Sequence, residues 1–192
     1  HFHFFAIKLN LHYYTMSHKV IPSKFKSLLE LIRFNRPIGF FLLMWPCWFA
    51  LASLPVIRLS HLKWYFLFII GSFLMRSAGC IINDLIDINL DKKVKRTSQR
   101  PLVIKSVSFF ESISLLALLL FFALLVLIQF NTKTIILIFL SLPLVILYPL
   151  MKRITNWPQL VLGVVYNWGV LIVSMQFNGY LTSTAIILYA GC

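Results

Sequence analysis

Acidic side chains are scarce in this sequence: five Asp and Glu residues stand against 18 Lys and Arg in 192 residues, and the formal net charge is +13. A strongly basic chain can bind nucleic acid, but here the basic residues fall mainly in short segments between long apolar runs. That distribution is the positive-inside pattern of membrane proteins. We therefore expect a lipid bilayer as the surrounding partner and no nucleic acid.

Cysteine is rare as well, with only Cys47, Cys80 and Cys192 and no Cys-x-x-Cys spacing. An odd, scattered set of this kind favours small apolar residues within helices over a disulfide framework or a cysteine metal site. No soluble domain, internal repeat or low-complexity linker is visible. The chain is 60% hydrophobic with a mean hydropathy of +0.88, which predicts a polytopic membrane protein with one membrane domain.

Six apolar segments follow one another along the chain, at about 38–57, 62–88, 107–130, 134–150, 159–177 and from 181 onward. Each complete one approaches the roughly 20 residues needed to cross hydrocarbon. The sequence thus predicts an all-α protein with five complete transmembrane helices and the start of a sixth. We expect residues 1–15 to be an upstream or non-native leader, and 16–192 to be a single membrane domain that is incomplete at its C-terminus.

The loops predict the orientation of these helices. Thirteen Lys and Arg residues lie in segments 16–37, 92–105 and 152–153, whereas the connections on the opposite side carry three. Because cytoplasmic loops are enriched in basic residues, the N-terminus and the segment after the second helix are predicted to be cytoplasmic.

Three of the five acidic residues, Asp84, Asp87 and Asp91, lie within eight positions at the end of the second apolar segment. A charged side chain at bilayer depth costs roughly 2.5–3.5 kcal/mol on insertion scales, so a cluster there indicates function. At about 100° per residue, these aspartates share one helix face with Asn83 and Arg76. Such a face must line a protein cavity because it cannot point at lipid.

Carboxylates at this spacing can hold Mg²⁺, which completes its coordination with water or phosphate oxygens. The basic segment that follows would hold the remaining charge of a diphosphate. A membrane site for a lipid diphosphate is therefore one interpretation. Two others stay open at this point: interfacial aspartates paired with the lysines that follow them, and a pathway for cations or protons.

The motif Asn83-Asp84-x-x-Asp87-x-x-x-Asp91 resembles the first aspartate-rich motif of the UbiA-type membrane aromatic prenyltransferases. The longer runs 75–87 and 95–102 are similar to the 4-hydroxybenzoate polyprenyltransferase branch of that family. The stretches 33–46 and 148–159 agree with the same branch. The resemblance extends over about 29–169.

This resemblance implies a nine-helix, all-α membrane fold with a cavity open to lipid. It implies Mg²⁺-dependent transfer of a polyprenyl group from polyprenyl diphosphate to the ring of 4-hydroxybenzoate, a step of ubiquinone biosynthesis, in the bacterial inner membrane. Mg²⁺ and cationic side chains would stabilise the departing diphosphate, and apolar walls would keep water from the allylic cation.

The resemblance also implies roles for particular residues. Asp84, Asp87 and Asp91 would bind the metal, and Asn83 would complete the catalytic motif. Arg76 would meet the benzoate carboxylate or the diphosphate, with pairing to the aspartates as its alternative role. Further substrate-binding candidates are Tyr148, Lys152, Arg153, Arg96 and Arg100. Topology-setting charge is the alternative for Lys152 and Arg153, and basic residues are expected in the loop of Arg96 and Arg100 in any case.

The sequence departs from the family pattern in two places. Asn35 stands where an aspartate is more usual, and Val103-Ile104-Lys105-Ser106 stands where a small Ser-Gly turn is more common. The family also has a second aspartate-rich motif after its sixth helix, beyond Cys192, so we expect these 192 residues alone to be inactive.

Other functions remain in competition. One is a different member of the superfamily that acts on haem, a naphthoate or a chlorophyllide. Another is a non-catalytic membrane protein, either a cation carrier or the remnant of a decayed gene. A soluble helical isoprenoid synthase is excluded by the continuous apolar segments.

Overall fold

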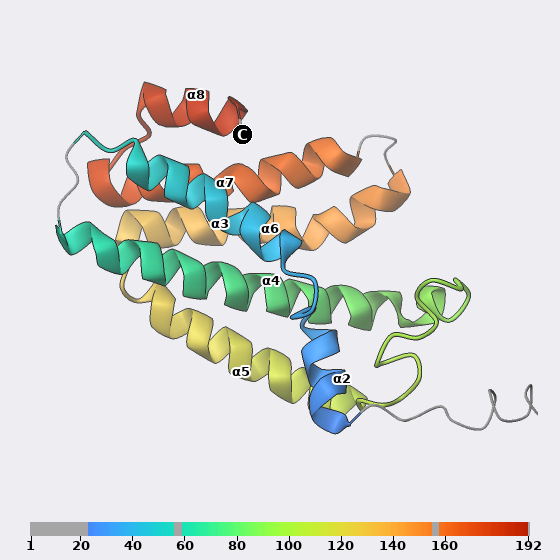
Figure 1. Ribbon diagram of the computed structural model, residues 1–192. Helices are drawn as coiled ribbons and strands as arrows, with labels where there is room; N and C mark the ends of the chain where they lie inside the picture. Colours follow the sequence, from blue (N-terminus) through green and yellow to red (C-terminus); the bar gives the residue numbers. More distant parts are fainter. Residues whose placement is uncertain (1–22, 56–58, 155–157, 192) are drawn as a thin grey trace, which may run out of the picture.

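The computed structural model describes residues 23–55, 59–154 and 158–191, without the side chains of residues 146–158. All elements in this part of the chain are helical (Figure 1), which confirms the predicted class: α2 (Lys24–Leu31), α3 (Ile38–Ala52), the short 3-10 helix η1 (Leu59–His61), α4 (Leu62–Asp91), α5 (Phe109–Leu127), α6 (Thr132–Ile154), α7 (Pro158–Asn178) and α8 (Ser183–Gly191).

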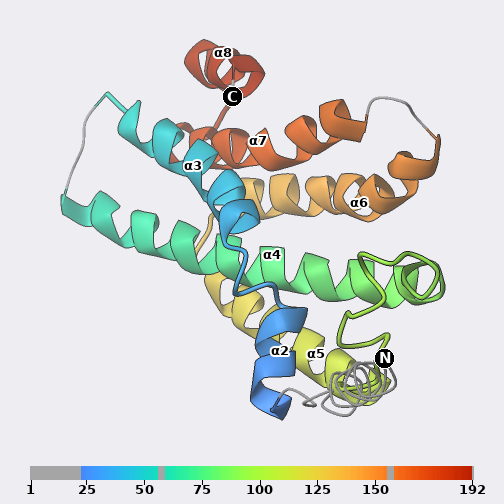
Figure 2. The same cartoon turned by 45° about the vertical axis from the view of Figure 1, so that its right-hand side comes forward.

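The long helices lie side by side, and successive ones run in opposite directions (Figures 1 and 2). Helix α4 packs against α3 on one side and α5 on the other, and α7 packs against both α3 and α6. Caps formed by nearby residues fix the starts of several helices. At the start of α5, for example, Ser108 and Glu111 form a capping box in which each side chain accepts a hydrogen bond from the other residue's backbone N–H.

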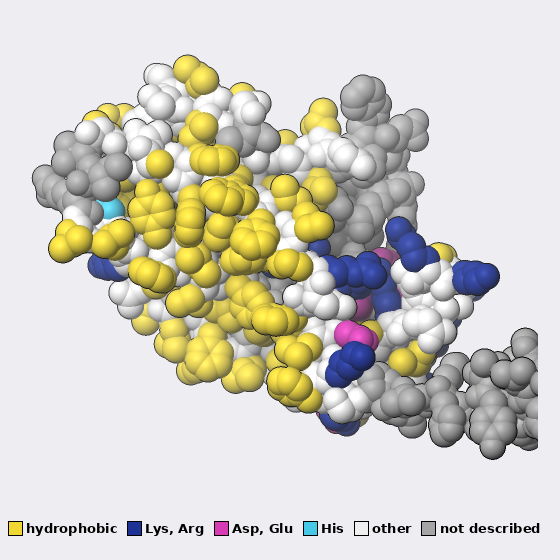
Figure 3. All heavy atoms as spheres, in the orientation of Figure 1, with side chains coloured by type: hydrophobic (Ala, Val, Ile, Leu, Met, Phe, Trp, Pro, Cys, Tyr) yellow, Lys and Arg dark blue, Asp and Glu magenta, His cyan; other side chains and the backbone are white. Residues whose placement is uncertain are grey.

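Among the described residues, three helices are long and apolar enough to cross a membrane, spanning Leu59–Asp91, Phe109–Leu127 and Gln159–Asn178. Two more helical stretches of the same part of the chain are apolar but shorter, Ile38–Ala52 and Thr132–Val145. Hydrophobic side chains cover most of the visible face (Figure 3). The chain is therefore a membrane protein, and the predicted first segment is shorter than expected because α3 ends at Ala52 rather than near residue 57.

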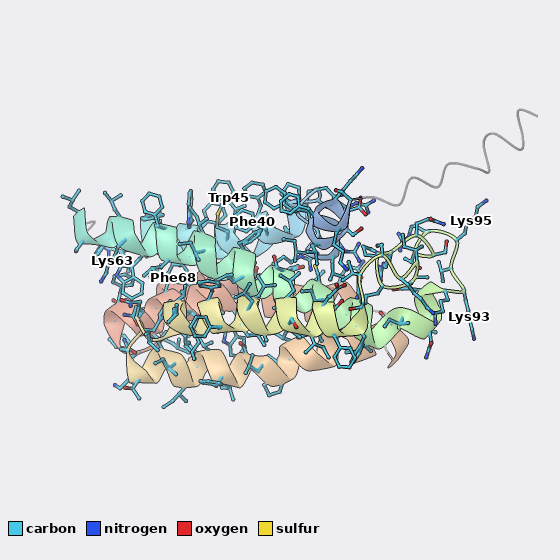
Figure 4. All side chains as sticks on the ribbon, turned by 90° about the horizontal axis from the view of Figure 1, so that it is seen from below. Phe40, Trp45, Lys63, Phe68, Lys93 and Lys95 are labelled. Carbon is cyan, nitrogen blue, oxygen red and sulfur yellow. The ribbon has the colours of Figure 1, made fainter. Side chains whose placement is uncertain are left out.

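The ends of the bundle differ in charge. Helix α2, the connection between α4 and α5, and the C-terminal end of α6 all lie at one end (Figures 1 and 2). Lys93 and Lys95 project from this end, whereas Lys63 lies at the opposite one (Figure 4). The described parts of the basic segments that the charge count grouped together thus share one end of the fold, and their placement in the cytoplasm remains a prediction.

Two apolar clusters hold the helices together. One joins α3, α4, α7 and α8, with Cys47, Trp64 and Val170 among its buried members. The other joins α2, α4, α5 and the connection that follows α4; its buried members are Leu31, Leu74, Ala78, Ile81, Leu102, Val107 and Leu119. The second cluster matters most here, since it fixes the elements that surround the aspartates.

Candidate functional site

Helix α4 carries the predicted site. It continues without a break to Asp91, so the aspartates lie on a true helix and the predicted shared face stands. Asp84 is buried, with 1% of its surface exposed, and Asp91 is 7% exposed. Asn83 and Asp87 are half-buried. A buried carboxylate requires compensating partners, which other elements supply here.

Arg33 is the first of these partners. Its Nη2 donates to both oxygens of Asp84, at 2.8 Å from Oδ1 and 3.1 Å from Oδ2. Arg33 follows α2 and has a φ of 60°, the left-handed region that non-glycine residues rarely adopt. Leu31, two residues earlier, is fully buried against α4. Burial of Leu31 anchors the end of α2, and the left-handed turn directs the guanidinium to Asp84.

Arg100 is the second partner. Its Nη1 lies 3.0 Å from Asp84 Oδ1 and also donates to Asp91 Oδ2. One guanidinium nitrogen therefore bridges two of the three aspartates. Together the two arginines and two carboxylates form a chain of ion pairs from α2 across α4 to the following connection. We call these four residues the Arg–Asp network.

The connection after α4 places Arg100 by folding back on the helix. Thr97 Oγ1 donates to the carbonyl of Asp91 at 3.2 Å, and the backbone N–H of Arg100 donates to the carbonyl of Thr97 at 3.0 Å. Leu102 and Val107 are buried in the same apolar cluster as Leu31. The polar contacts turn the chain, and the apolar contacts hold the turn against α4.

Arg76 lies two turns before Asp84 and does not join the network. No ion pair links it to a carboxylate of the described residues, and its buried Nε has no hydrogen-bond partner among them. Its guanidinium instead packs over Gly39 of α3, where a Cβ would come within 2.7 Å of Cζ. In this structure Arg33 and Arg100, rather than Arg76, pair with Asp84 and Asp91.

The remaining predicted residues are less closely placed. Arg96 is exposed on the same connection. The side chains of Tyr148, Lys152 and Arg153 lie outside the described residues, although their backbone belongs to the C-terminal end of α6. That end lies at the same end of the bundle as Asp91 (Figures 1 and 2).

Arg33 was missed as a site residue by sequence reasoning, which counted it only as a topology-setting charge. Its partner is 51 residues away. No spacing rule links a residue before the first apolar segment to an aspartate at the end of the second. The only available signal was its position in the stretch that resembles the family.

The donor chemistry of the cluster suits Mg²⁺, since carboxylate oxygens are the ligands this ion prefers. The described side chains do not bring three His, Cys, Asp or Glu residues together as a metal site. Arg100 stands between Asp84 and Asp91 instead. The aspartates therefore fit the ion by chemistry, and the arginine contacts must open before all three can share one.

A hollow of about 320 Å³ lies at the other end of the bundle, among α3, α7 and α8. Ser174, Asn178 and Thr182 supply polar atoms to its wall. None of the predicted site residues lines it, so it is separate from the aspartates.

Comparison with known proteins agrees with the motif. Residues 43–192 match the UbiA prenyltransferase family. The chain belongs to this family. It is 46% identical to the mitochondrial 4-hydroxybenzoate polyprenyltransferase of Caenorhabditis elegans, over 85% of this chain and 46% of the relative. It is also 46% identical to the 4-hydroxybenzoate octaprenyltransferase of a Vibrio cholerae strain, over 86% of this chain and 58% of the relative.

The fold of a solved UbiA homologue is similar too. The apo structure of the homologue from Aeropyrum pernix K1 superposes with a TM-score of 0.61 at 26% identity, over 79% of this chain and 55% of the other. The present chain spans about half the length of the UbiA proteins it matches.

Proposed function

We propose that the protein transfers a polyprenyl group from polyprenyl diphosphate to the ring of 4-hydroxybenzoate, the acceptor named for its relatives. The observation that carries this proposal is the motif of Asn83 and three aspartates, on the face of α4 that also carries Arg76 and beside a strongly basic end of the bundle. Ubiquinone biosynthesis is the pathway in which this product would be used.

Mg²⁺, held by Asp84, Asp87 and Asp91, would neutralise charge on the leaving diphosphate. The chain's own residues would do the rest. Arg96 and Arg100, with Tyr148, Lys152 and Arg153 at the same end, would bind phosphate oxygens. Arg76, with no carboxylate partner among the described residues, would bind the carboxylate of the aromatic acid. Apolar helix faces would hold the prenyl chain and exclude water.

The membrane in which this happens is part of the proposal. A bacterial inner membrane agrees with the octaprenyltransferase relatives, and an organelle membrane agrees with those named mitochondrial. In both cases α2 and the connection after α4 would face the compartment that supplies the soluble aromatic acid.

Substitution of Asp87 by alanine in the full-length protein tests the proposal. Membranes that carry the variant should lose Mg²⁺-dependent incorporation of labelled 4-hydroxybenzoate into a lipid product. The amount of inserted protein should not decrease, because Asp87 is half-buried at the end of α4 and removal of a charge eases insertion.

A panel of haem, naphthoate and chlorophyllide acceptors distinguishes the competing members of the superfamily. Full activity of Asp87→Ala would refute the metal assignment, and transfer to another acceptor in place of 4-hydroxybenzoate would refute the substrate.

A further inference from the structure

The Arg–Asp network has a consequence for the order in which ligands bind. Asp84 and Asp91 carry two negative charges, and Arg33 and Arg100 carry two positive charges, so the network is neutral by itself. Asp84 is 1% exposed, and the side chains of Arg33 and Arg100 are 23% and 19% exposed. These pairs therefore interact in surroundings where water screens them poorly.

We propose that Arg33 and Arg100 act as internal counter-ions that keep a divalent metal from binding alone, so that metal and diphosphate bind together. The inference rests on the proposed function and extends it, because it assigns to Arg33 a positioning role and to Arg100 a second role besides phosphate contact.

The first step of the argument is repulsion. A divalent cation that enters the aspartates with the network intact meets two guanidinium groups within a few ångströms. Arg100 Nη1 already occupies the position between Asp84 Oδ1 and Asp91 Oδ2. The cation would have to displace these groups while offering them no other partner, and a partly buried guanidinium without a partner is costly.

The second step is exchange of partners. A diphosphate presents several anionic oxygens, and these bind guanidinium groups strongly. When it arrives with the metal, the arginines can turn from carboxylate to phosphate, and the aspartates become available to the cation. Each ligand thus removes the obstacle to the other, which is positive coupling between two sites.

The test measures binding of Mn²⁺, as the metal probe, to the full-length protein in detergent by equilibrium dialysis. Geranyl thiolodiphosphate, which resists ionisation, serves as the diphosphate probe. In the wild type, the probe should increase Mn²⁺ affinity at least about tenfold, the ratio expected from one charge-assisted hydrogen bond. By linkage, Mn²⁺ should increase the affinity for the probe by the same factor.

Arg33→Gln and Arg100→Gln should each bind Mn²⁺ alone about tenfold more tightly than the wild type and show weaker coupling. Lys93→Gln is the matched control: it removes one positive charge from the connection that carries Arg100, but Lys93 projects into solvent (Figure 4). Its Mn²⁺ affinity should match that of the wild type.

Equal Mn²⁺ affinity of the wild type with and without the probe would overturn the inference, and this measurement depends on no variant. Unchanged or weaker binding of Mn²⁺ alone by both arginine variants would overturn it as well. If Mn²⁺ binds with the same affinity with and without the probe, and Asp87→Asn abolishes this binding, the metal site stands and only the present inference is refuted. Absence of Mn²⁺ binding, or binding that Asp87→Asn leaves intact, would refute the metal site and the inference with it.

Discussion

Replacement of Gly39 by alanine tests the proposed role of Arg76 without changing Arg76 itself. The added Cβ would lie within 2.7 Å of the Arg76 Cζ, too close for the present arrangement. The obstructing group is the end of a flexible side chain rather than backbone, so the guanidinium should move and α3 should stay in place. Gly39→Ala should therefore raise the KM for 4-hydroxybenzoate more than the KM for the prenyl diphosphate.

The size of this effect follows from the contact that is lost. A hydrogen bond to a charged group contributes about 1.5–3 kcal/mol. Since about 1.4 kcal/mol corresponds to a factor of ten, the KM for the aromatic acid should rise about tenfold to a hundredfold. The kcat should change little if Arg76 binds the carboxylate equally in the ground state and the transition state.

Steady-state kinetics on membranes that contain the full-length protein would measure both KM values. Gly79→Ala is the matched control, since Gly79 lies on α4 one turn after Arg76 and an added Cβ there meets nothing within 4 Å. Arg76→Ala should show the same pattern as Gly39→Ala. The double variant should be no worse than Arg76→Ala, because both changes remove one interaction.

Two results would refute this reasoning. An unchanged KM for the acid combined with a lower melting temperature would mean that the helices separate and the guanidinium stays. Additive effects in the double variant would mean that Gly39 acts through something other than Arg76.

Two further predictions concern stability, measured by thermal unfolding in detergent. Gly169→Ala should destabilise the protein by about 1–3 kcal/mol, because the added Cβ would overlap Cys47 Sγ where α7 packs against α3. Cys47→Ala in the same protein should restore the melting temperature. A double variant that does not recover would contradict this account. Lys105→Gly should stabilise the protein by up to about 1 kcal/mol, since Lys105 has a φ of 60°. Lys105→Ala removes the charge but keeps a residue with a Cβ in the left-handed conformation, so it should not stabilise the protein. An equal gain in stability in both variants would mean that loss of the charge is the cause.

Hydropathy predicted the long helices well, because a continuous apolar run in a membrane has few alternatives to a helix. The five segments after the first begin and end within a few residues of α4, α5, α6, α7 and α8. Helix α2 was not predicted. It is eight residues long and mixes lysines with apolar residues, so its basic residues were read only as orientation signals.

The sequence was enough to predict which polar residues share one face of α4, but not which residues of other elements contact that face. Periodicity relates residues of one helix to each other, so it placed Asn83 and the aspartates on the side of Arg76. It contains no information on which other element approaches that side. The contacts of Asp84 with Arg33 and Arg100 come from the docking of α2 and of the later connection, which depends on burial of Leu31, Leu102 and Val107.

One departure from the family pattern now has a physical reading. The position where a Ser-Gly turn is more common contains Lys105, whose backbone is left-handed, the conformation that glycine adopts without cost. The connection is held at this point by the carbonyl of Pro101, which accepts hydrogen bonds from the backbone N–H groups of Ser106 and Val107.

The Arg–Asp network joins segments that are far apart in the chain. Arg33 precedes Asp84 by 51 residues, and Arg100 follows it on the connection after α4. Asp84 contacts both arginines, so loss of its charge would leave two guanidinium groups without that partner at once. The attachment of α2 and the attachment of the connection to the bundle therefore both depend on one carboxylate of α4.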